Sequence, residues 1–259
     1  MKTILITGSS SGFGKEMSES LACLGFHVLA TMRNAEIRHD IFDHLDQNTK
    51  KNITLYNLDV SSDADIESLY NELQSKNIVI DVLINNAGYA IYGALEEFTM
   101  LQIRQQMEVN YFGVVKMIKQ FLPMLRQSEG KIINISSLMG EFSMPLGSCY
   151  SASKFAVEGI TECLAYELRP YKVQVTSILP GAHRTGFIDA INWSDGQSNK
   201  SIYKGQMEGI DNMMNKVKHR KIIPQSNNIS KLIYKIICRK NISRRYYLGS
   251  DAILAHYCR

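Results

Sequence analysis

The residues with the clearest chemical potential are Tyr150 and Lys154, in the segment CYSASKF at 149–155. They stand four positions apart, so on a helix they share one face. A phenol gives or takes a proton, and a neighbouring ammonium stabilises the phenolate and lowers the pKa of the phenol. The pair is therefore a candidate proton donor beside the cation that tunes it. A packed surface helix that carries both residues by chance is the alternative.

A glycine-rich segment, TGSSSGFG at 7–14, is the second chemical feature. Gly8, Gly12 and Gly14 allow a tight turn and a close approach of the backbone to a pyrophosphate. The segment follows a predicted strand and opens a predicted helix, whose free N–H groups and positive dipole end favour phosphate. In this context the segment predicts a nucleotide site, with an ordinary glycine-rich turn as the alternative.

The end of the second predicted strand, ATMRN at 30–34, bears on which nucleotide binds. NAD sites usually carry an acidic residue there, which holds the ribose 2′-hydroxyl. Arg33 stands in this region instead, and a guanidinium binds phosphate in a forked geometry. The sequence therefore favours NADP(H) over NAD(H), with an exposed loop arginine as the alternative.

Short apolar runs alternate with longer amphipathic ones, and this pattern positions the chemical residues. The runs predict strands at 3–7, 27–31, 53–58, 81–85, 131–136, 173–179 and 245–250, and helices at 14–25, 63–76, 98–126 and 150–169. Such alternation indicates right-handed βαβ units. We therefore expect an α/β fold: one Rossmann-type domain over 1–259, with a doubly wound, mostly seven-stranded parallel sheet and helices on both faces.

Residues 181–225 interrupt the alternation and are rich in Asn, Ser, Gly and Met. They follow the carboxyl end of a strand, which is where ligands bind in open α/β sheets. We therefore expect a substrate lid over about 186–222, made of loops or interrupted helices, rather than an unstructured insertion. Its apolar residues suit a lipophilic ketone or alcohol, or else only pack the lid onto the body: Phe187, Trp193, Tyr203 and Met207.

Composition excludes several classes of protein. The 259 residues are 45% hydrophobic and 21% charged, with a net charge of +4, which is typical of a globular chain. The basic run KVKHRK at 216–221 is interpreted as a solvated helix face, so no nucleic-acid partner is expected. Five cysteines without a CxxC pair predict free thiols in a cytoplasmic protein. No signal peptide, membrane span or metal-binding spacing of histidines is expected.

Seven segments, in this order, resemble the motifs of the short-chain dehydrogenases/reductases. They are TGSSSGFG, LDV at 58–60, NNAG at 85–88, Asn110 in VNYFG, ISS at 135–137, YSASK at 150–154 and PGAHRT at 180–185. Each is modest alone, but the ordered set is specific and spans nearly the whole chain. ATMRN and the segment RYYLGSDA at 245–252 carry a narrower resemblance to the estradiol 17-beta-dehydrogenase and retinol dehydrogenase-like branch.

This resemblance implies a role for each matching residue. Tyr150 looks like the acid–base, Lys154 like its partner that also holds the nicotinamide ribose, and Ser137 like the group that binds the substrate oxygen. Asn110 is similar to the residue that holds a proton-relay water. With Arg33, the implied cofactor-binding residues are Gly8, Ser10, Ser11, Gly12, Phe13, Gly14, Asp59, Val60, Asn86, Ala87, Gly88, Tyr150, Lys154, Pro180, Gly181, His183 and Thr185.

Three residues depart from the family pattern. Phe13 replaces a common Ile, which is an apolar exchange. Ser11 stands where some NADP-dependent members carry a basic residue, which leaves most of the 2′-phosphate recognition to Arg33. His183 replaces an apolar residue whose backbone commonly helps to bind the carboxamide; its imidazole either leaves that contact intact or faces substrate.

These features predict an NADP(H)-dependent oxidoreductase that transfers a hydride between nicotinamide and a ketone or secondary alcohol, with Tyr150 as acid–base. The alternative is a non-catalytic NADP(H)-binding module that senses redox state, although such a module has no need of the Asn–Ser–Tyr–Lys set. The phosphate-type loop disfavours a methyltransferase, and the lack of GxSxG disfavours a serine nucleophile. Apolar residues around the helices at 98–126 and 150–169 predict a homodimer, or a tetramer.

Overall fold

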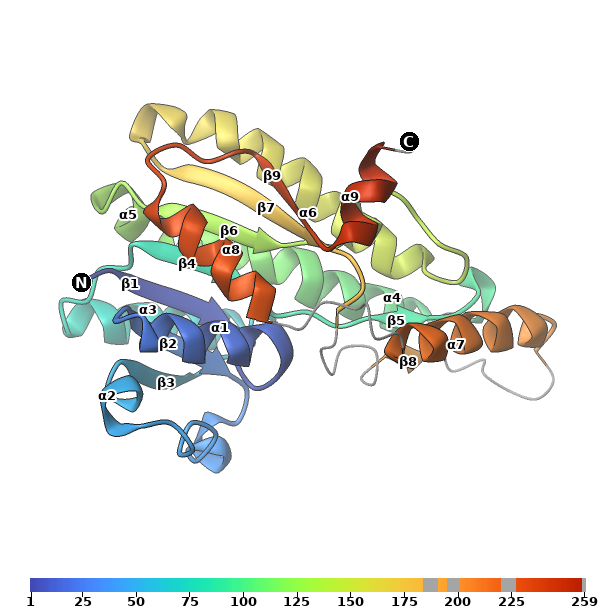
Figure 1. The fold of residues 1–259 in the computed structure, drawn as a ribbon, viewed down its shortest axis with the longest axis horizontal. Helices are drawn as coiled ribbons and strands as arrows, with labels where there is room; N and C mark the ends of the chain where they lie inside the picture. The colour runs from blue at the N-terminus through green and yellow to red at the C-terminus, as the bar shows by residue number, and fades with distance from the viewer. Residues whose placement is uncertain (184–190, 195–200, 220–226, 258–259) are drawn as a thin grey trace.

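The computed structural model describes residues 1–183, 191–194, 201–219 and 227–257. Seven parallel strands form one sheet, which confirms the predicted seven-stranded parallel sheet, and their order is β3-β2-β1-β4-β6-β7-β9 (Figure 1). The strands are β1 Thr3–Thr7, β2 His27–Met32, β3 Ile53–Asn57, β4 Val82–Asn85, β6 Lys131–Ile135, β7 Gln174–Pro180 and β9 Arg245–Leu248.

The strands are apolar on both sides because helices cover both faces of the sheet. In β1, Ile4 and Ile6 point into one hydrophobic cluster, whereas Leu5 points into the other, and all three are fully buried. Such double burial is typical of parallel sheets and explains why the strands are continuous apolar runs rather than alternating ones. The two clusters are the core that holds the carboxyl ends of the strands in place.

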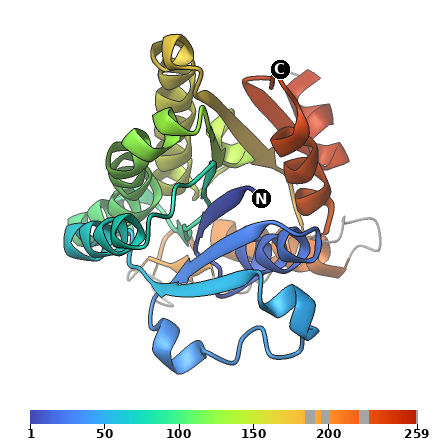
Figure 2. The same ribbon diagram turned by 90° about the vertical axis from the view of Figure 1, so that its left-hand side faces the viewer.

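Two helical layers enclose the sheet (Figure 2). On one face lie α1 Gly12–Cys23 and α8 Asn227–Cys238, and on the other lie α3 Asp63–Ser75, α5 Gly113–Gln127 and α6 Ser148–Glu167. A short α2 spans Gln47–Lys50. The sequence did not predict α8, although its four buried isoleucines have helical spacing: Ile229, Ile233, Ile236 and Ile237.

The predicted helix at 98–126 is divided in the structure. It consists of α4 Met100–Met107, a π-helical turn at Glu108–Phe112, and then α5. A π-helical turn inserts one extra residue into a helix and is frequent at functional sites. Asn110, one of the predicted site residues, lies inside this turn, so the helix is divided at a candidate functional position.

A small lobe stands beside the main sheet. Strands β5 Ile91–Tyr92 and β8 Asn192–Trp193 pair in parallel, and α7 Lys204–His219 extends away from the body (Figure 1). The prediction of loops or interrupted helices is wrong for 204–219, which form one continuous helix. Met207 and Ile210 are buried there, and their burial outweighs the cost of about 1 kcal/mol for each helical glycine. Phe187 and Thr185 lie outside the described residues.

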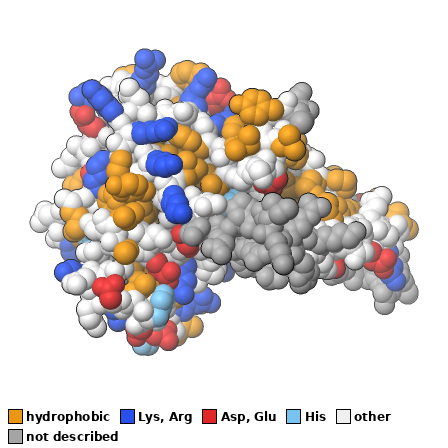
Figure 3. Space-filling view, viewed as in Figure 1, with side chains coloured by type: hydrophobic (Ala, Val, Ile, Leu, Met, Phe, Trp, Pro, Cys, Tyr) orange, Lys and Arg blue, Asp and Glu red, His pale blue; other side chains and the backbone are white. Residues whose placement is uncertain are grey.

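The last described helix, α9 Ser250–Tyr257, follows directly after β9. Figure 3 shows hydrophobic side chains exposed over the edge of the molecule where α9 lies. Ile253, Leu254 and Tyr257 are 48%, 66% and 81% exposed. Among the described helices, none combines the length and the apolar composition that crossing a membrane requires.

Candidate active site

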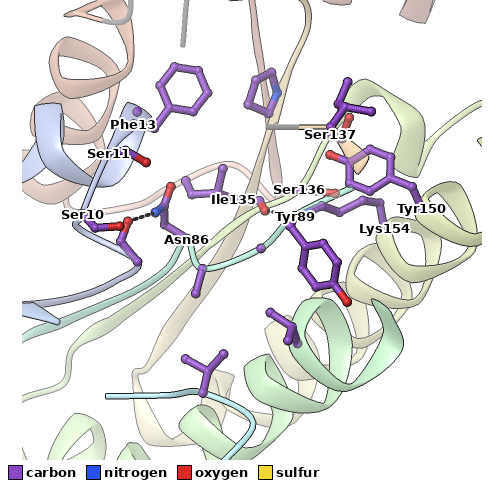
Figure 4. A pocket seen from close by; sticks show the side chains of 18 of the residues that line it. Ser10, Ser11, Phe13, Asn86, Tyr89, Ile135, Ser136, Ser137, Tyr150 and Lys154 are labelled. Carbon is purple, nitrogen blue, oxygen red and sulfur yellow. Dashed lines mark hydrogen bonds between the residues drawn. The ribbon is translucent and has the colours of Figure 1, made fainter. Parts of the chain in front are cut away.

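The turns that follow β1, β4, β6 and β7 line one cavity of about 1270 Å³ at the carboxyl edge of the sheet. This is the edge at which open α/β sheets bind ligands. Figure 4 shows Ser10 and Ser11 toward one end of the pocket and the Ser137 and Tyr150 hydroxyls side by side at the other. The fold therefore brings the glycine-rich loop and the Tyr–Lys pair into one site.

The glycine-rich loop has a backbone that other residues adopt only with strain. Gly8 and Gly12 have φ angles of +72° and +53°. A Cβ on Gly14 would lie 2.1 Å from the carbonyl oxygen of Gly8, so the first turn of α1 packs tightly beneath the loop. Asn86 Nδ2 donates hydrogen bonds to the carbonyl oxygens of Thr7 and Gly8, at 2.9 and 3.0 Å. The turn after β4 thus fixes the loop that begins after β1.

Helix α6 places Tyr150 in its first turn and Lys154 one turn later, on the same face as predicted. The Lys154 Nζ atom lies 5.8 Å from the centroid of the Tyr150 ring and donates a hydrogen bond of 2.9 Å to the Ile135 carbonyl oxygen. The two residues are only 5% and 6% exposed. The phenol and the ammonium are therefore neighbours in a largely dry site.

This burial shifts both ionisation equilibria toward the neutral forms. Burial raises the pKa of Tyr150 above its usual range, and a hydrogen bond with Ser137 opposes the rise. Burial lowers the pKa of Lys154 to about 8, and the nearby Glu158 carboxylate opposes the fall. The prediction that the Tyr150 pKa is lowered is wrong for this structure, because desolvation outweighs the other effects on the phenol. Tyr150 accordingly keeps its proton at neutral pH.

Asn110 lies behind the wall of the cavity, where it is 1% exposed. Its Nδ2 donates to the Tyr89 carbonyl oxygen at 2.9 Å and to Ser153 Oγ at 3.0 Å, while its Oδ1 accepts from the Tyr89 N–H at 3.1 Å. A Cβ on Gly88 would lie 3.1 Å from this Oδ1 and 3.7 Å from Lys154 Nζ. The side chain thus ties the π-helical turn to the site, and a relay water at Asn110 stays a prediction.

The end of the cavity beyond β2 and β3 is polar. Arg33 lines it, as do Asp59 and Val60. Asp59 Oδ1 accepts hydrogen bonds from the N–H and hydroxyl of Ser61, at 2.9 and 2.6 Å. The sequence interpretation missed Arg38, which also lines this end from a 3₁₀ turn at 35–38. The available signal was a second arginine five positions after Arg33.

The turn after β7 also lines the cavity, next to the glycine-rich loop. His183 is 4% exposed, its Nδ1 lies 3.1 Å from the Gly181 carbonyl oxygen, and its ring meets the Phe13 ring edge-on at 5.3 Å. Asp251 of α9 accepts a hydrogen bond of 2.6 Å from the Ala182 N–H. A Cβ on Gly181 would lie 2.2 Å from Asp251 Oδ1, so a larger residue there would displace this carboxylate. Sequence reasoning missed Asp251, which lies far along the chain from this turn.

The structure brings most of the predicted site residues to the cavity wall. Gly14 lies beneath the loop and Asn110 behind the wall, and Thr185 is outside the described residues. The predicted residues that line the cavity are Gly8, Ser10, Ser11, Gly12, Phe13, Arg33, Asp59, Val60, Asn86, Ala87, Gly88, Ser137, Tyr150, Lys154, Pro180, Gly181 and His183.

Comparison with known proteins agrees with this architecture. The family model described as short chain dehydrogenase matches residues 2–195. The chain is 37% identical over 247 residues, 95% of its length, to a 3-ketodihydrosphingosine reductase of Bacteroides thetaiotaomicron, of which it covers 87%.

Solved structures show the same fold. The closed form of a serine dehydrogenase complexed with NADP⁺ matches with a TM-score of 0.80 and 25% identity, over 95% of this chain and 94% of that one. A short chain dehydrogenase/reductase from Burkholderia phymatum in complex with NAD matches with a TM-score of 0.80 and 26% identity, over 98% and 91%. The narrower resemblance to the estradiol and retinol dehydrogenase branch stays a prediction. The family model and the relatives show that the chain belongs to the short-chain dehydrogenases, oxidoreductases that act on CH–OH or keto groups with a nicotinamide cofactor.

Proposed function

We propose that this protein is an NADP(H)-dependent oxidoreductase for ketones and secondary alcohols that carry an apolar chain, with Tyr150 as the acid–base. One observation carries the proposal. Ser137, Tyr150 and Lys154 lie together at one end of a cavity whose other end holds the glycine-rich loop and two arginines. The enzyme class follows from the family, whereas the cofactor preference, the substrate class and the residue roles are proposed here.

The residues along the cavity fit a dinucleotide. The loop carries Gly8, Gly12 and Gly14, which let its backbone approach a pyrophosphate, and it leads into the N-terminus of α1, where the helix dipole favours negative charge. Asn86, Ala87 and Gly88 line the wall between this loop and Tyr150. When bound there in reduced form, the cofactor supplies a hydride to the carbonyl carbon of the substrate.

Tyr150 is the proton donor for the substrate oxygen in the proposed reduction. Its raised pKa keeps the phenol protonated at neutral pH, so the proton is available when the carbonyl oxygen gains negative charge. The Ser137 hydroxyl lies beside the phenol and holds the same oxygen in place. The carbonyl thus gains a hydride at carbon and a proton at oxygen, and the phenolate then regains a proton from water.

Lys154 is the cation that stabilises the phenolate left on Tyr150. Because its pKa is lowered to about 8, the amine carries its charge near neutral pH and loses it in mildly alkaline solution. The Ile135 carbonyl oxygen holds the amine in position, at 2.9 Å. Reduction therefore depends on a lysine whose charge changes close to the working pH.

Arg33 and Arg38 support the preference for NADP(H). Both line the adenosine end of the cavity, and a guanidinium pairs with the dianionic 2′-phosphate through charge-assisted hydrogen bonds. Both side chains are exposed and free to close on a phosphate. Neither is needed for the 2′-hydroxyl of NAD(H), which usually bonds to an acidic residue.

Apolar side chains support a lipophilic substrate. Tyr92, Met139 and Met144 line the cavity near Tyr150, and Met213 and Met214 reach it from α7. Methionine is flexible and adapts to apolar ligands of irregular shape. The similarity to a reductase named for a long-chain ketone, 3-ketodihydrosphingosine, supports the same substrate class. The proposed lid, over about 186–222, includes α7.

A panel of carbonyl compounds tests the function. We expect NADPH oxidation, followed by absorbance, with ketones of increasing chain length and with 3-ketodihydrosphingosine, and a higher kcat/KM for the longer chains. Tyr150→Phe removes the transferable proton and almost no volume, so turnover should fall by at least about 10²-fold while NADPH affinity stays close to normal. Most of the wild-type rate remaining in this variant would refute the acid–base role. A wild-type protein that binds NADPH but reduces none of these carbonyl compounds would instead indicate a non-catalytic module that senses redox state.

A further inference from the structure

A buried carboxylate lies one helical turn beyond Lys154. Glu158 follows it by four positions in α6, so Tyr150, Lys154 and Glu158 lie in a row along one face of the helix. Glu158 is 4% exposed. Charged side chains are almost never buried to this degree unless they are paired. The sequence analysis singled out the first two residues of this row and passed over the third.

Only one oxygen of this carboxylate has hydrogen-bond partners among the described residues. Glu158 Oε2 accepts from Ser177 Oγ at 3.0 Å and from Arg245 Nε at 2.7 Å. Glu158 Oε1 is buried and has no hydrogen-bond partner within the part of the chain that is described. Serine from β7 and arginine from β9 therefore anchor the side chain and leave part of its charge uncompensated by hydrogen bonds.

The side chain of Glu158 packs directly against the turn that follows Ser137. A Cβ on Gly140 would lie 3.1 Å from Glu158 Cγ, 3.1 Å from the Lys154 carbonyl oxygen and 2.8 Å from Ser136 Oγ. Gly140 belongs to the 3₁₀ turn that begins after Ser137. The loop that carries Ser137, the backbone of Lys154 and the side chain of Glu158 thus meet at one point.

The Lys154 amine needs a counter-charge. Lys154 is only 6% exposed, and the Ile135 carbonyl oxygen to which its amine donates a hydrogen bond is neutral. Burial alone favours the uncharged amine, whereas a nearby carboxylate favours the ammonium. The Arg245 side chain is 39% exposed, so water screens it, while the interaction between two buried groups is screened much less.

We propose that Glu158 is a positioning residue of the site: it is the buried counter-charge that keeps the Lys154 amine a cation beside Tyr150. This role rests on the proposed function, in which Lys154 stabilises the phenolate. Arg245 and Ser177 hold the carboxylate in place and do not touch the cavity that contains Tyr150. The edge strand β9 is thereby linked to the acid–base pair through one side chain.

The other ionisable groups around this row do not replace Glu158. Tyr247 stays neutral over the useful pH range because burial raises its pKa to about 12. His256 of α9 pairs with Glu141, at 2.9 Å. Glu162 lies one turn further along α6 and is 49% exposed, so its charge is better screened. Tyr150 is the titratable group beside the Lys154 amine among the described residues, and those around Glu158 are Glu141, Glu162, Arg244, Arg245, Tyr247 and His256.

The first test is the pH profile of NADPH-dependent reduction. Glu158→Gln keeps the shape and the oxygen that accepts from Ser177, and removes the charge. In wild type, kcat/KM should fall at alkaline pH as Lys154 loses its charge. In Glu158→Gln, we expect this fall to begin about one pH unit lower. Glu158→Asp should restore most of the wild-type profile. Glu162→Gln is the matched control, because it removes a carboxylate from the same arginine cluster and should leave the profile unchanged. An unshifted profile in Glu158→Gln overturns the proposal.

The second test needs no turnover. The pKa of Lys154 is below that of a lysine in the unfolded chain, so its buried charge destabilises the fold in full below about pH 8, where the amine is charged in both states. The cost then declines as pH rises from about 8 toward the ordinary lysine pKa of 10.5, and the folded amine, neutral over that range, no longer needs a carboxylate beside it. The melting temperature of Glu158→Gln should therefore lie furthest below wild type at pH 6–7 and approach it at pH 9. If the melting temperature of Glu158→Gln lies below wild type by the same amount over this whole pH range, Glu158 only forms the ion pair with Arg245. Because the measurement is made on the enzyme without substrate, its failure is distinct from a failure of the proposed function.

Discussion

At the scale of single residues, burial gives the phenol and the ammonium opposite pKa shifts. The phenol keeps its proton above neutral pH, while the amine begins to lose its own at about pH 8. Both shifts have the same physical cause, which is the cost of charge in a dry site. The resting site therefore holds a protonated Tyr150, which is the form that reduction of a carbonyl consumes. Alcohol oxidation needs the phenolate, so it should require more alkaline conditions.

Arg33 should decide the cofactor preference. Arg33→Asp places a negative charge against the 2′-phosphate, so NADPH affinity should fall by about 10²-fold, whereas NADH affinity should change little. Fluorescence titration of both cofactors measures the two changes. Arg38→Ala should give a smaller loss, confined to NADPH. Equal losses for the two cofactors would mean that Arg33 is structural, and a wild-type preference for NADH would remove the NADP(H) assignment altogether.

At the scale of elements, the sequence predicted the sheet well and parts of the site less well. The seven strand predictions agree with the structure to within two residues at each end, because doubly buried strands are uninterrupted apolar runs. The π-helical turn was not predicted, since it depends on the contacts of Asn110 with Tyr89 and Ser153, which are distant in sequence. Asp251 was missed for the same reason, because only the folded chain brings it to the turn after β7, whereas Arg38 was missed although it lies five positions after Arg33.

The small β5–β8 sheet offers a direct test of the lid. Trp193, the only tryptophan, lies with its ring 6.4 Å from that of Tyr92, and the Tyr92 ring lies 6.3 Å from that of Tyr150. Adding NADPH with a poor substrate should therefore change the Trp193 fluorescence, and hydrogen exchange in α7 should slow. Trp193→Phe is the control for the optical signal. If neither signal moves while calorimetry confirms binding, the segment packs on the body and is not a lid.

At the scale of the whole molecule, two exposed apolar surfaces bear on assembly. One lies on α4, the π-helical turn and α6, and the other on α9. Patches of this kind often mark protein–protein interfaces. The residues of the first surface, 41–65% exposed, are Met100, Leu101, Phe112, Phe155 and Tyr166. The first surface belongs to the helices for which the sequence predicted self-association, so we predict that a dimer would form through it and that any further assembly would use the α9 surface.

The oligomer prediction is tested by light scattering at micromolar concentration. The wild-type protein should have at least twice the chain mass of 29.3 kDa. Phe155→Glu, which puts a charge into the first surface, should shift the mass to that of one chain. Leu254→Glu, on α9, should leave a dimer intact and dissociate only a tetramer. A wild-type protein of single-chain mass contradicts both assignments.

The position of β9 at the edge of the sheet has a consequence for synthesis on the ribosome. Arg245, which holds Glu158, and Asp251, which holds the turn after β7, come from one short segment late in the chain. A nascent chain that ends before residue 245 can form the first six strands of the sheet, but it lacks both anchors. Activity should therefore appear only after this segment has left the exit tunnel. Until then, the edge of β7 that pairs with β9 has no strand beside it.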